Sequence, residues 1–366
     1  MDIYTNSIVE GGFEEDKEIS ALEAKYEAQK IAFAPIMFQA SIALRDLGIL
    51  SLLMKARKTG GYSIEEISKK LGLSIYGVKV LLEAGLSLRM VKQKDDKFSI
   101  TKIGYFMNSD PLTIANTDFT QDVNYLGMFK LKESIINGKP EGLKEFGEWP
   151  TVYEALSELP DNIRKSWFAF DHFYSDYSFP EVMPILFALH PKKIMDVGGN
   201  TGKFSLQCAA YNADVEMTIV DLPGQINDAK KNIAAAGMSD RVHYHPLNLL
   251  GDNVLLPKGF DIIWMSQFLD CFSQEEISKL LSYAYEAMDN NTSLFIMETY
   301  WDKQRFEAST YSLHATSLYF TAIANGNSQM YHSRDMLKLI DTAGLYVKEE
   351  WHEVGISHSL YRCMKR

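Results

Sequence analysis

Residues 192–202 read Lys-Lys-Ile-Met-Asp-Val-Gly-Gly-Asn-Thr-Gly, and this stretch decides the fold. A short apolar run carries one acid, Asp196, and then breaks into glycines at Gly198, Gly199 and Gly202. The residues that follow have the composition of a helix. A buried strand that leads through a tight turn into a helix presses backbone N–H groups against an anionic ligand.

The spacing of this turn favours S-adenosylmethionine over NAD. It reads Asp-x-Gly-x-Asn-x-Gly, with Val197 where a dinucleotide-binding turn needs its first glycine. A second acid, Asp221, ends the next apolar run and lies 23 positions after Gly198. That distance suits an acid that binds a ribose hydroxyl.

From residue 193 onward, strand patterns alternate with helix patterns, which predicts an α/β domain with a mostly parallel, Rossmann-like sheet. The expected strands lie at 194–197, 216–220, 242–246, 261–265, 293–297, 346–351 and 357–363. The last two are expected to pair as a hairpin. Ligands of such sheets bind at the carboxyl ends of the strands. The polar residues at or near those ends are Asp196, Asp221, Asn248, Asp270 and Glu298.

The N-terminal half predicts a mostly helical domain. Its expected elements are a long helical region over 20–58, helices over 64–70 and 74–86, and a two-stranded ribbon over 90–93 and 97–101. Ser63 and Glu66 have the spacing of a capping box. This order resembles a winged helix, but the second helix of the pair offers one base, Lys79, and also carries Glu83. A DNA-binding helix usually contacts the phosphates through several basic residues, so we favour a dimerisation domain over a DNA-binding one.

Composition and charge restrict the kinds of partner and the cellular compartment that we expect for this chain. The chain of 366 residues has a net charge of -11, which argues against nucleic acid or an anionic membrane surface. Residues 1–20 are acidic and polar, unlike a signal peptide, and no apolar run is long enough to span a membrane. Three scattered cysteines favour a reducing cytoplasm, and no metal-ligand spacing is present; His243 and His245 lack a third ligand.

Aromatic residues are dense between 167 and 179. Such a stripe at helical spacing is usually core, and here it could equally line an apolar pocket. Both interpretations stay open from the sequence.

Taken together, these features resemble the small-molecule O-methyltransferases of the caffeic-acid and acetylserotonin type. The most specific elements are Asp-Val-Gly-Gly-Asn-Thr-Gly at 196–202 and Asp-Leu-Pro at 221–223, with the run from Phe170 to Ser178 in the linking helix. The resemblance covers about residues 25–365. It implies S-adenosylmethionine as cofactor, a homodimer formed through the N-terminal domain, and a small, aromatic methyl acceptor.

The resemblance also implies roles for individual residues. Gly198, Gly199 and Gly202 would hold the methionine end, Asp221 the ribose, and Leu222 the adenine. Ser178 would reach the cofactor carboxylate, and Ser266 stands where the family has a lysine that contacts the cofactor. The full set of expected cofactor residues is Ser178, Asp196, Gly198, Gly199, Gly202, Asp221, Leu222, Asn248, Leu249 and Ser266.

At the chemical centre the chain departs from the family pattern. The family's general-base histidine aligns with Asp270, and the segment 325–331 lacks the glutamate that braces that histidine. We therefore expect Asp270, assisted by Glu298, to be catalytic, because burial or a second carboxylate raises the pKa of an acid toward that of a useful base. The alternatives are that the acceptor is acidic enough to need no base, that Asp270 caps the helix that begins near Ser273, or that the base is a histidine elsewhere. The candidate histidines are His172, His314 and His332.

These observations predict an S-adenosylmethionine-dependent O-methyltransferase. Two alternatives remain: a cofactor-binding relative that performs hydroxylation or decarboxylation, and a winged-helix regulator that senses the cofactor. The expected domains are a flexible N-terminus (1–24), a dimerisation domain (25–110), linking helices that contribute to the acceptor pocket (111–190) and the catalytic domain (191–366).

Overall fold

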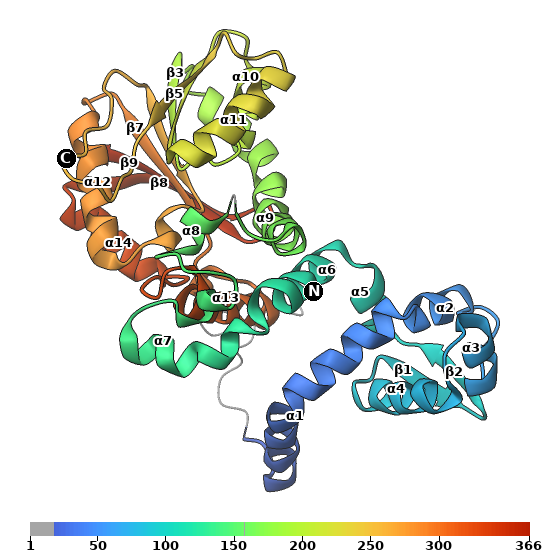
Figure 1. The fold of residues 1–366 in the computed structure, drawn as a ribbon. Coiled ribbons are helices and arrows are strands. Elements are labelled where there is room, and N and C mark those ends of the chain that lie inside the picture. The colour runs from blue at the N-terminus through green and yellow to red at the C-terminus, as the bar shows by residue number, and fades with distance from the viewer. Residues whose placement is uncertain (1–17, 157) are drawn as a thin grey trace, which may run out of the picture. The chain divides into compact units, whose positions relative to one another are not determined.

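The computed structural model describes residues 18–156 and 158–366. The chain divides into two compact units, one within Asp16–Asp118 and the other from Phe119 to Arg366 (Figure 1). The predicted flexible N-terminus, 1–24, lies outside the described residues as far as residue 17, and a helix already begins at Ala21.

The first unit has the element order expected of a winged helix. Its elements are α1 (Ala21–Asp46), α2 (Ile49–Lys55), α3 (Ile64–Leu71), α4 (Ile75–Ser87), β1 (Val91–Lys94), β2 (Lys97–Ile100), α5 (Lys102–Ser109) and α6 (Pro111–Asp118). The capping box is confirmed, since Ser63 Oγ accepts the N–H of Glu66 and the Glu66 carboxylate accepts the N–H of Ser63. The two strands pair in antiparallel fashion, and a small core lies between them and α2–α4.

Helix α1 is only partly packed. Leu44 near its C-terminal end is fully buried, whereas Leu22, Ile31 and Ile36 are exposed by 65–78%. No single helix among the described residues is long and apolar enough to cross a membrane, although α1 and α2, taken as a bent pair, pass that test by length and composition.

The second unit is a seven-stranded sheet covered by helices on both faces (Figure 1). Its strands are β3 (Lys193–Val197), β4 (Glu216–Asp221), β5 (Val242–Pro246), β6 (Ile262–Ser266), β7 (Ser293–Glu298), β8 (Leu345–Val354) and β9 (His358–Lys365). The longer helices are α7 (Leu131–Asn137), α9 (Asp161–Phe187), α10 (Lys203–Tyr211), α11 (Pro223–Ala235), α12 (Gln274–Ala287), α13 (Glu307–Tyr319) and α14 (Ser333–Thr342). Short turns of helix are η2 (Phe119–Asn124), η3 (Gly127–Lys130), η4 (Glu141–Glu145), α8 (Val152–Ala155), η5 (Leu269–Cys271), η6 (Trp301–Lys303) and η7 (Phe320–Ala324).

The strand order, β5-β4-β3-β6-β7-β9-β8, positions the site. Strands β3 to β7 run parallel and the closing pair β8–β9 is antiparallel to them, as the sequence predicts. The first strand of the sheet, β3, has β4 on one side and β6 on the other. The chain order therefore reverses at the carboxyl end of β3, and such a switch point is where open α/β sheets bind ligands.

Hydrophobic side chains fix this sheet from both faces. One core lies between the sheet and helices α12 and α14, and the other lies between the sheet and α9, α10 and α11. All six residues of β7 are buried. Continuous burial of this kind is typical of parallel strands that are covered on both faces.

Candidate active site

The turn after β3 has no room for a side chain at Gly198 or Gly199. Gly198 has φ of +74°, and its N–H donates to the carbonyl of Val220 over 2.9 Å. A Cβ on Gly199 would lie 2.8 Å from the Asp196 carboxylate, closer than real Cβ atoms approach. Gly202 closes the turn by donating its N–H to the carbonyl of Gly199. The backbone is thereby exposed as a cradle at the switch point.

Two acids shape this cradle. Asp196 is buried and accepts a hydrogen bond from Ser205 Oγ at 2.7 Å; burial raises its pKa to about 7, with Asp221 contributing. Asp221 accepts the N–H groups of Asn200 (2.8 Å) and Leu222 (2.7 Å). Burial raises the pKa of Asp221 to about 6, and these two hydrogen bonds oppose that rise. Asp221 thus ties β4 to the glycine turn.

A cavity of about 370 Å³ opens at the carboxyl ends of β3, β4 and β6. It has a glycine side, formed by Gly198, Gly199, Asn200 and Asp221, and an aromatic side, formed by Phe119, Trp167, Phe170 and Tyr319. Nine of the predicted site residues line it: Asp196, Gly198, Gly199, Asp221, Leu222, Asn248, Leu249, Ser266 and Asp270.

Three predicted site residues do not line the cavity. Gly202 shapes the turn from behind. Ser178 is fully buried, and its Oγ lies 2.7 Å from His358 Nδ1 on β9, so the predicted contact of Ser178 with a cofactor carboxylate does not fit this geometry. The α9 serine that lines the cavity is Ser175, almost one helical turn earlier. The third residue is Glu298.

Glu298 supports the turn that carries Asp270. Its Oε1 accepts the N–H groups of Phe268 (3.0 Å) and Leu269 (2.8 Å), while the residue itself is 1% exposed. Burial and the charge of Asp270 raise the pKa of Glu298 well above its usual range. The Glu298 carboxyl therefore binds the main chain of Phe268 and Leu269, and it does not line the cavity.

The segment 325–331 braces the same turn in place of the missing glutamate. Asn325 Nδ2 donates to the carbonyl of Cys271 at 2.6 Å, and Tyr331 Oη donates to the carbonyl of Phe272 at 2.6 Å. The main chain around Asp270 is thus held by side chains from two segments, Glu298 of β7 and residues 325–331. The sequence alone did not indicate this substitute brace.

Asp270 itself lies on the cavity wall and is 5% exposed. Burial raises its pKa to about 6, although the Cys271 thiol donates to Oδ1 at 3.4 Å. The helix that follows is capped by Ser273, which forms a capping box with Glu276. The alternative in which Asp270 serves as that cap is therefore wrong.

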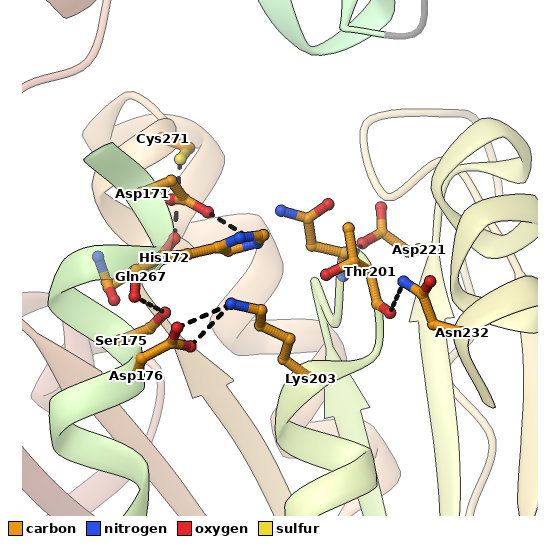
Figure 2. A network of polar contacts seen from close by, with 11 residues as sticks. Asp171, His172, Ser175, Asp176, Thr201, Lys203, Asp221, Asn232, Gln267 and Cys271 are labelled. Atoms are coloured by element: carbon orange, nitrogen blue, oxygen red, sulfur yellow. Dashed lines mark hydrogen bonds and ion pairs between the residues drawn. The ribbon is translucent and has the colours of Figure 1, made fainter. Parts of the chain in front are cut away.

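The sequence analysis missed Asp171. It lies on α9 and lines the cavity, and its carboxylate lies 3.9 Å from His172 Nε2 (Figure 2). Burial and the charge of Asp270 raise its pKa to about 7. The signal was available, since Asp171 belongs to the quoted linking-helix run, but spacing alone gave no reason to choose it.

Of the three candidate histidines, His172 alone lines the cavity. Burial and the charge of Lys203 together lower its pKa to about 4. His332 caps α14 by accepting the N–H of Arg334, and the His314 ring packs against Trp301. A base with a pKa near 4 is weaker than Asp171 or Asp270 at neutral pH.

The aromatic side combines core and pocket, so both interpretations of the 167–179 stripe hold in part. Phe119 stacks on Phe170 with ring centroids 4.0 Å apart, and Trp167 Nε1 donates to Tyr319 Oη at 2.7 Å. Phe119, Trp167 and Tyr319 are buried, Phe170 is partly buried, and all four line the cavity. A flat apolar molecule suits such a wall.

Comparisons with known proteins identify the class. Residues 25–98 match the Dimerisation2-like domain, and residues 185–346 match the O-methyltransferase domain. The L-tyrosine C(3)-methyltransferase of Streptomyces lavendulae is 24% identical over 305 residues, which cover 82% of this chain and 81% of that protein. The acetylserotonin O-methyltransferase of Gallus gallus is 23% identical over 281 residues, covering 74% and 79%. The crystal structure of the S-adenosylmethionine-dependent methyltransferase SibL in its apo form superposes with a TM-score of 0.71 at 22% identity, covering 95% of this chain and 99% of SibL.

The chain is therefore a methyltransferase with a Rossmann-like catalytic domain. Residues 185–346 are an O-methyltransferase domain, and the relatives of the chain include an acetylserotonin O-methyltransferase, as the resemblance implied.

S-adenosylmethionine is the cofactor of this class, and the cavity fits it. Gly198 and Gly199 line the cavity with bare backbone, and a Cβ there would strike Phe268 or Asp196. Two buried polar atoms at the end of β6, Ser266 Oγ and Gln267 Oε1, have no hydrogen-bond partner among the described residues, and both residues line the cavity. Unsatisfied buried polar atoms of this kind indicate a site for a polar ligand.

Proposed function

We propose that this enzyme methylates an oxygen of a small aromatic acceptor, with Asp270 as the general base. The observation that carries the proposal is the position of Asp270, a buried carboxyl on the cavity wall with a pKa of about 6. The names of the relatives support an aromatic acceptor, since one is a methyltransferase of L-tyrosine and another of acetylserotonin.

We assign the cofactor to the glycine side. Gly198 and Gly199 would contact its methionine end, Asp221 its ribose, and Leu222, Asn248 and Leu249 its adenine. Asn248 Oδ1 already accepts the N–H of Leu250 at 3.0 Å, so the side-chain amide N–H₂ is left for the ligand. When bound, S-adenosylmethionine supplies an electrophilic methyl group on a sulfonium.

The chain's own residues would orient the acceptor, accept its proton and position the base. The rings of Phe119, Phe170 and Tyr319 would orient the acceptor, and alignment alone supplies much of the acceleration of such a displacement. Asp270 would remove the hydroxyl proton, which is efficient because its pKa lies near neutral pH. Asp171, with a pKa of about 7, is a second proton acceptor on the same wall. Glu298 would position Asp270 without touching the acceptor.

The test is incubation with S-adenosylmethionine and a panel of phenols, catechols and hydroxynaphthoates, followed by mass spectrometry. The proposal expects a product heavier by one methylene, whose formation falls sharply in Asp270→Asn. If every acceptor stays unmodified while S-adenosylhomocysteine still binds, methyl transfer has been lost and the alternative without it is favoured.

Carbon methylation is a second candidate, favoured by the name of the tyrosine C(3)-methyltransferase. Deprotonation of a phenol by Asp270 also activates the neighbouring ring carbons, so the same carboxyl serves both reactions. Nuclear magnetic resonance of the product distinguishes a methoxy group from a ring methyl group.

We also propose a homodimer formed through the N-terminal unit, in a cytoplasmic setting. The match of residues 25–98 to a Dimerisation2-like domain and the exposed apolar side chains of α1 support the dimer. Light scattering of the full chain tests it, with Ile31→Glu and Ile36→Glu as the disrupting variants.

A further inference from the structure

Neither Ser178 nor Ser266 brings a positive charge to the cofactor's carboxylate. Ser266 stands where the family has a lysine, and Ser178 is buried against His358. An amino-acid carboxylate bound in a partly enclosed site needs a cation or several donors. The positive end of the site must therefore come from elsewhere.

Among the described residues that line the cavity, Lys203 is the one lysine or arginine. It directly follows Gly202 at the start of α10, so it leaves the glycine turn on the cavity side. Figure 2 shows its side chain crossing toward α9, where Nζ lies 3.0 and 2.8 Å from the two oxygens of Asp176. Asp176 itself does not line the cavity.

His172 cannot take the same role at neutral pH. It lies on the cavity wall near Lys203, but burial and the charge of that lysine lower the pKa of His172 to about 4. The ring is therefore neutral, and Lys203 carries the fixed positive charge. The Lys203 and Asp176 side chains are 38% and 44% exposed, so their ion pair is weak and leaves the ammonium able to bind a second anion.

We propose that Lys203, positioned by Asp176, binds the carboxylate of the cofactor's amino-acid end. The inference rests on the proposed placement of the methionine end at the glycine side. It makes Lys203 a determinant of affinity for the amino-acid portion of the ligand and leaves the nucleoside portion to Asp221 and Leu222.

Three ligands isolate this contact by calorimetry without any acceptor: S-adenosylhomocysteine, its decarboxylated analogue, and methylthioadenosine, which lacks the amino acid. In Lys203→Met, the affinity for S-adenosylhomocysteine should fall about 10- to 100-fold, the range of a hydrogen bond to a charged group. The affinities for the two ligands without a carboxylate should change by less than about threefold.

Matched variants complete the experiment. Lys203→Arg should keep most of the affinity, and Asp176→Asn, which leaves the ammonium in place, should lose less than about fivefold. Lys231→Met removes an exposed lysine that is also paired with an aspartate and should change nothing.

Equal losses for all three ligands in Lys203→Met, or no loss for any, would overturn the assignment. Because no acceptor is present, failure of methyl transfer leaves this result intact. Failure of the wild-type chain to bind any of the three nucleosides would overturn both the assignment and the proposed function.

Discussion

The two sides of the cavity are built in different ways. The glycine side comes from two consecutive strands and their turns, and main-chain hydrogen bonds fix it: Gly198 to Val220, and Asn200 and Leu222 to Asp221. The aromatic side is assembled from η2, α9 and α13, and side-chain packing fixes it. The first side is local in sequence and constrained by backbone geometry, whereas the second exists only after the chain has folded.

Loss of the general base, which separates catalysis from cofactor binding on the glycine side, should give the largest change, and that change should appear in turnover. We expect Asp270→Asn to lower turnover about 10²- to 10⁴-fold, the usual contribution of a general base, with less than a threefold change in S-adenosylhomocysteine affinity. In the wild type, activity should rise with pH through about pH 6, as the carboxyl with its raised pKa ionises. Steady-state kinetics and calorimetry measure the two quantities. Asp240→Asn on the surface is the control, and full turnover in Asp270→Asn across pH would rule out the direct-base mechanism.

Filling the cradle should damage the glycine side next most. In Gly199→Ala the new methyl group meets the Asp196 carboxylate and Ile219, which should destabilise the fold by about 1–3 kcal/mol and weaken methylthioadenosine binding at least about tenfold. Gly224→Ala is the matched control, because a Cβ there meets nothing within 4 Å. Thermal unfolding and calorimetry report the two effects. Equal behaviour of the two alanine variants would mean that close backbone approach is not what the glycine turn provides.

The support beneath Asp270 can be separated from the base itself. Glu298→Gln keeps an oxygen that accepts the N–H groups of Phe268 and Leu269, so turnover should stay within about tenfold of wild type. Glu298→Ala leaves both donors unpaired in the interior and should cost about 1–3 kcal/mol of stability as well as activity. Urea unfolding and kinetics on both variants test this. A loss in Glu298→Gln as large as that in Asp270→Asn would instead make Glu298 a catalytic residue.

The smallest predicted effect concerns Asp171 and pH. Its folded-state pKa of about 7 lies above the ordinary value of 3.8, so the folded protein binds more protons than the unfolded chain between about pH 4 and pH 7. Stability of the ligand-free protein therefore falls as pH rises through this window. Asp171→Asn should remove that part of the fall, on the order of 1 kcal/mol at pH 8 after allowance for solvent screening. Urea unfolding at pH 4.5 and pH 8 measures it, and an unchanged pH dependence in the variant would contradict it.

The same contrast explains what the sequence could predict. All seven strands of the sheet, the winged-helix order and the glycine turn follow from local apolar periodicity and from glycines in positions that only glycine can occupy. Asp171 and the braces from Asn325 and Tyr331 could not be found this way. Asp270, whose charge acts on Asp171, and the carbonyls that Asn325 and Tyr331 contact lie far from them in sequence, and no local pattern encodes a tertiary contact.

Ser178 illustrates a different limit. The resemblance to the family suggested the right helix, but the register of side chains around α9 decides which serine faces the cavity. A shift of three residues is almost one turn, so Ser175 and Ser178 lie on neighbouring parts of the same helix face with different surroundings. Packing of α9 against β9 at His358 determines the outcome.

Each side of the cavity also contains one indole. Trp167 lies on the aromatic side with its N–H bonded to Tyr319, and Trp264 of β6 lines the cavity while stacked on Phe204 at 4.3 Å. Intrinsic fluorescence therefore offers two built-in reporters. The chain has five tryptophans, so each reporter is read as the ligand-induced change in emission that its substitution removes. Trp167→Phe should remove the change caused by the acceptor and Trp264→Phe the change caused by the nucleoside, which makes the order of binding visible without a label.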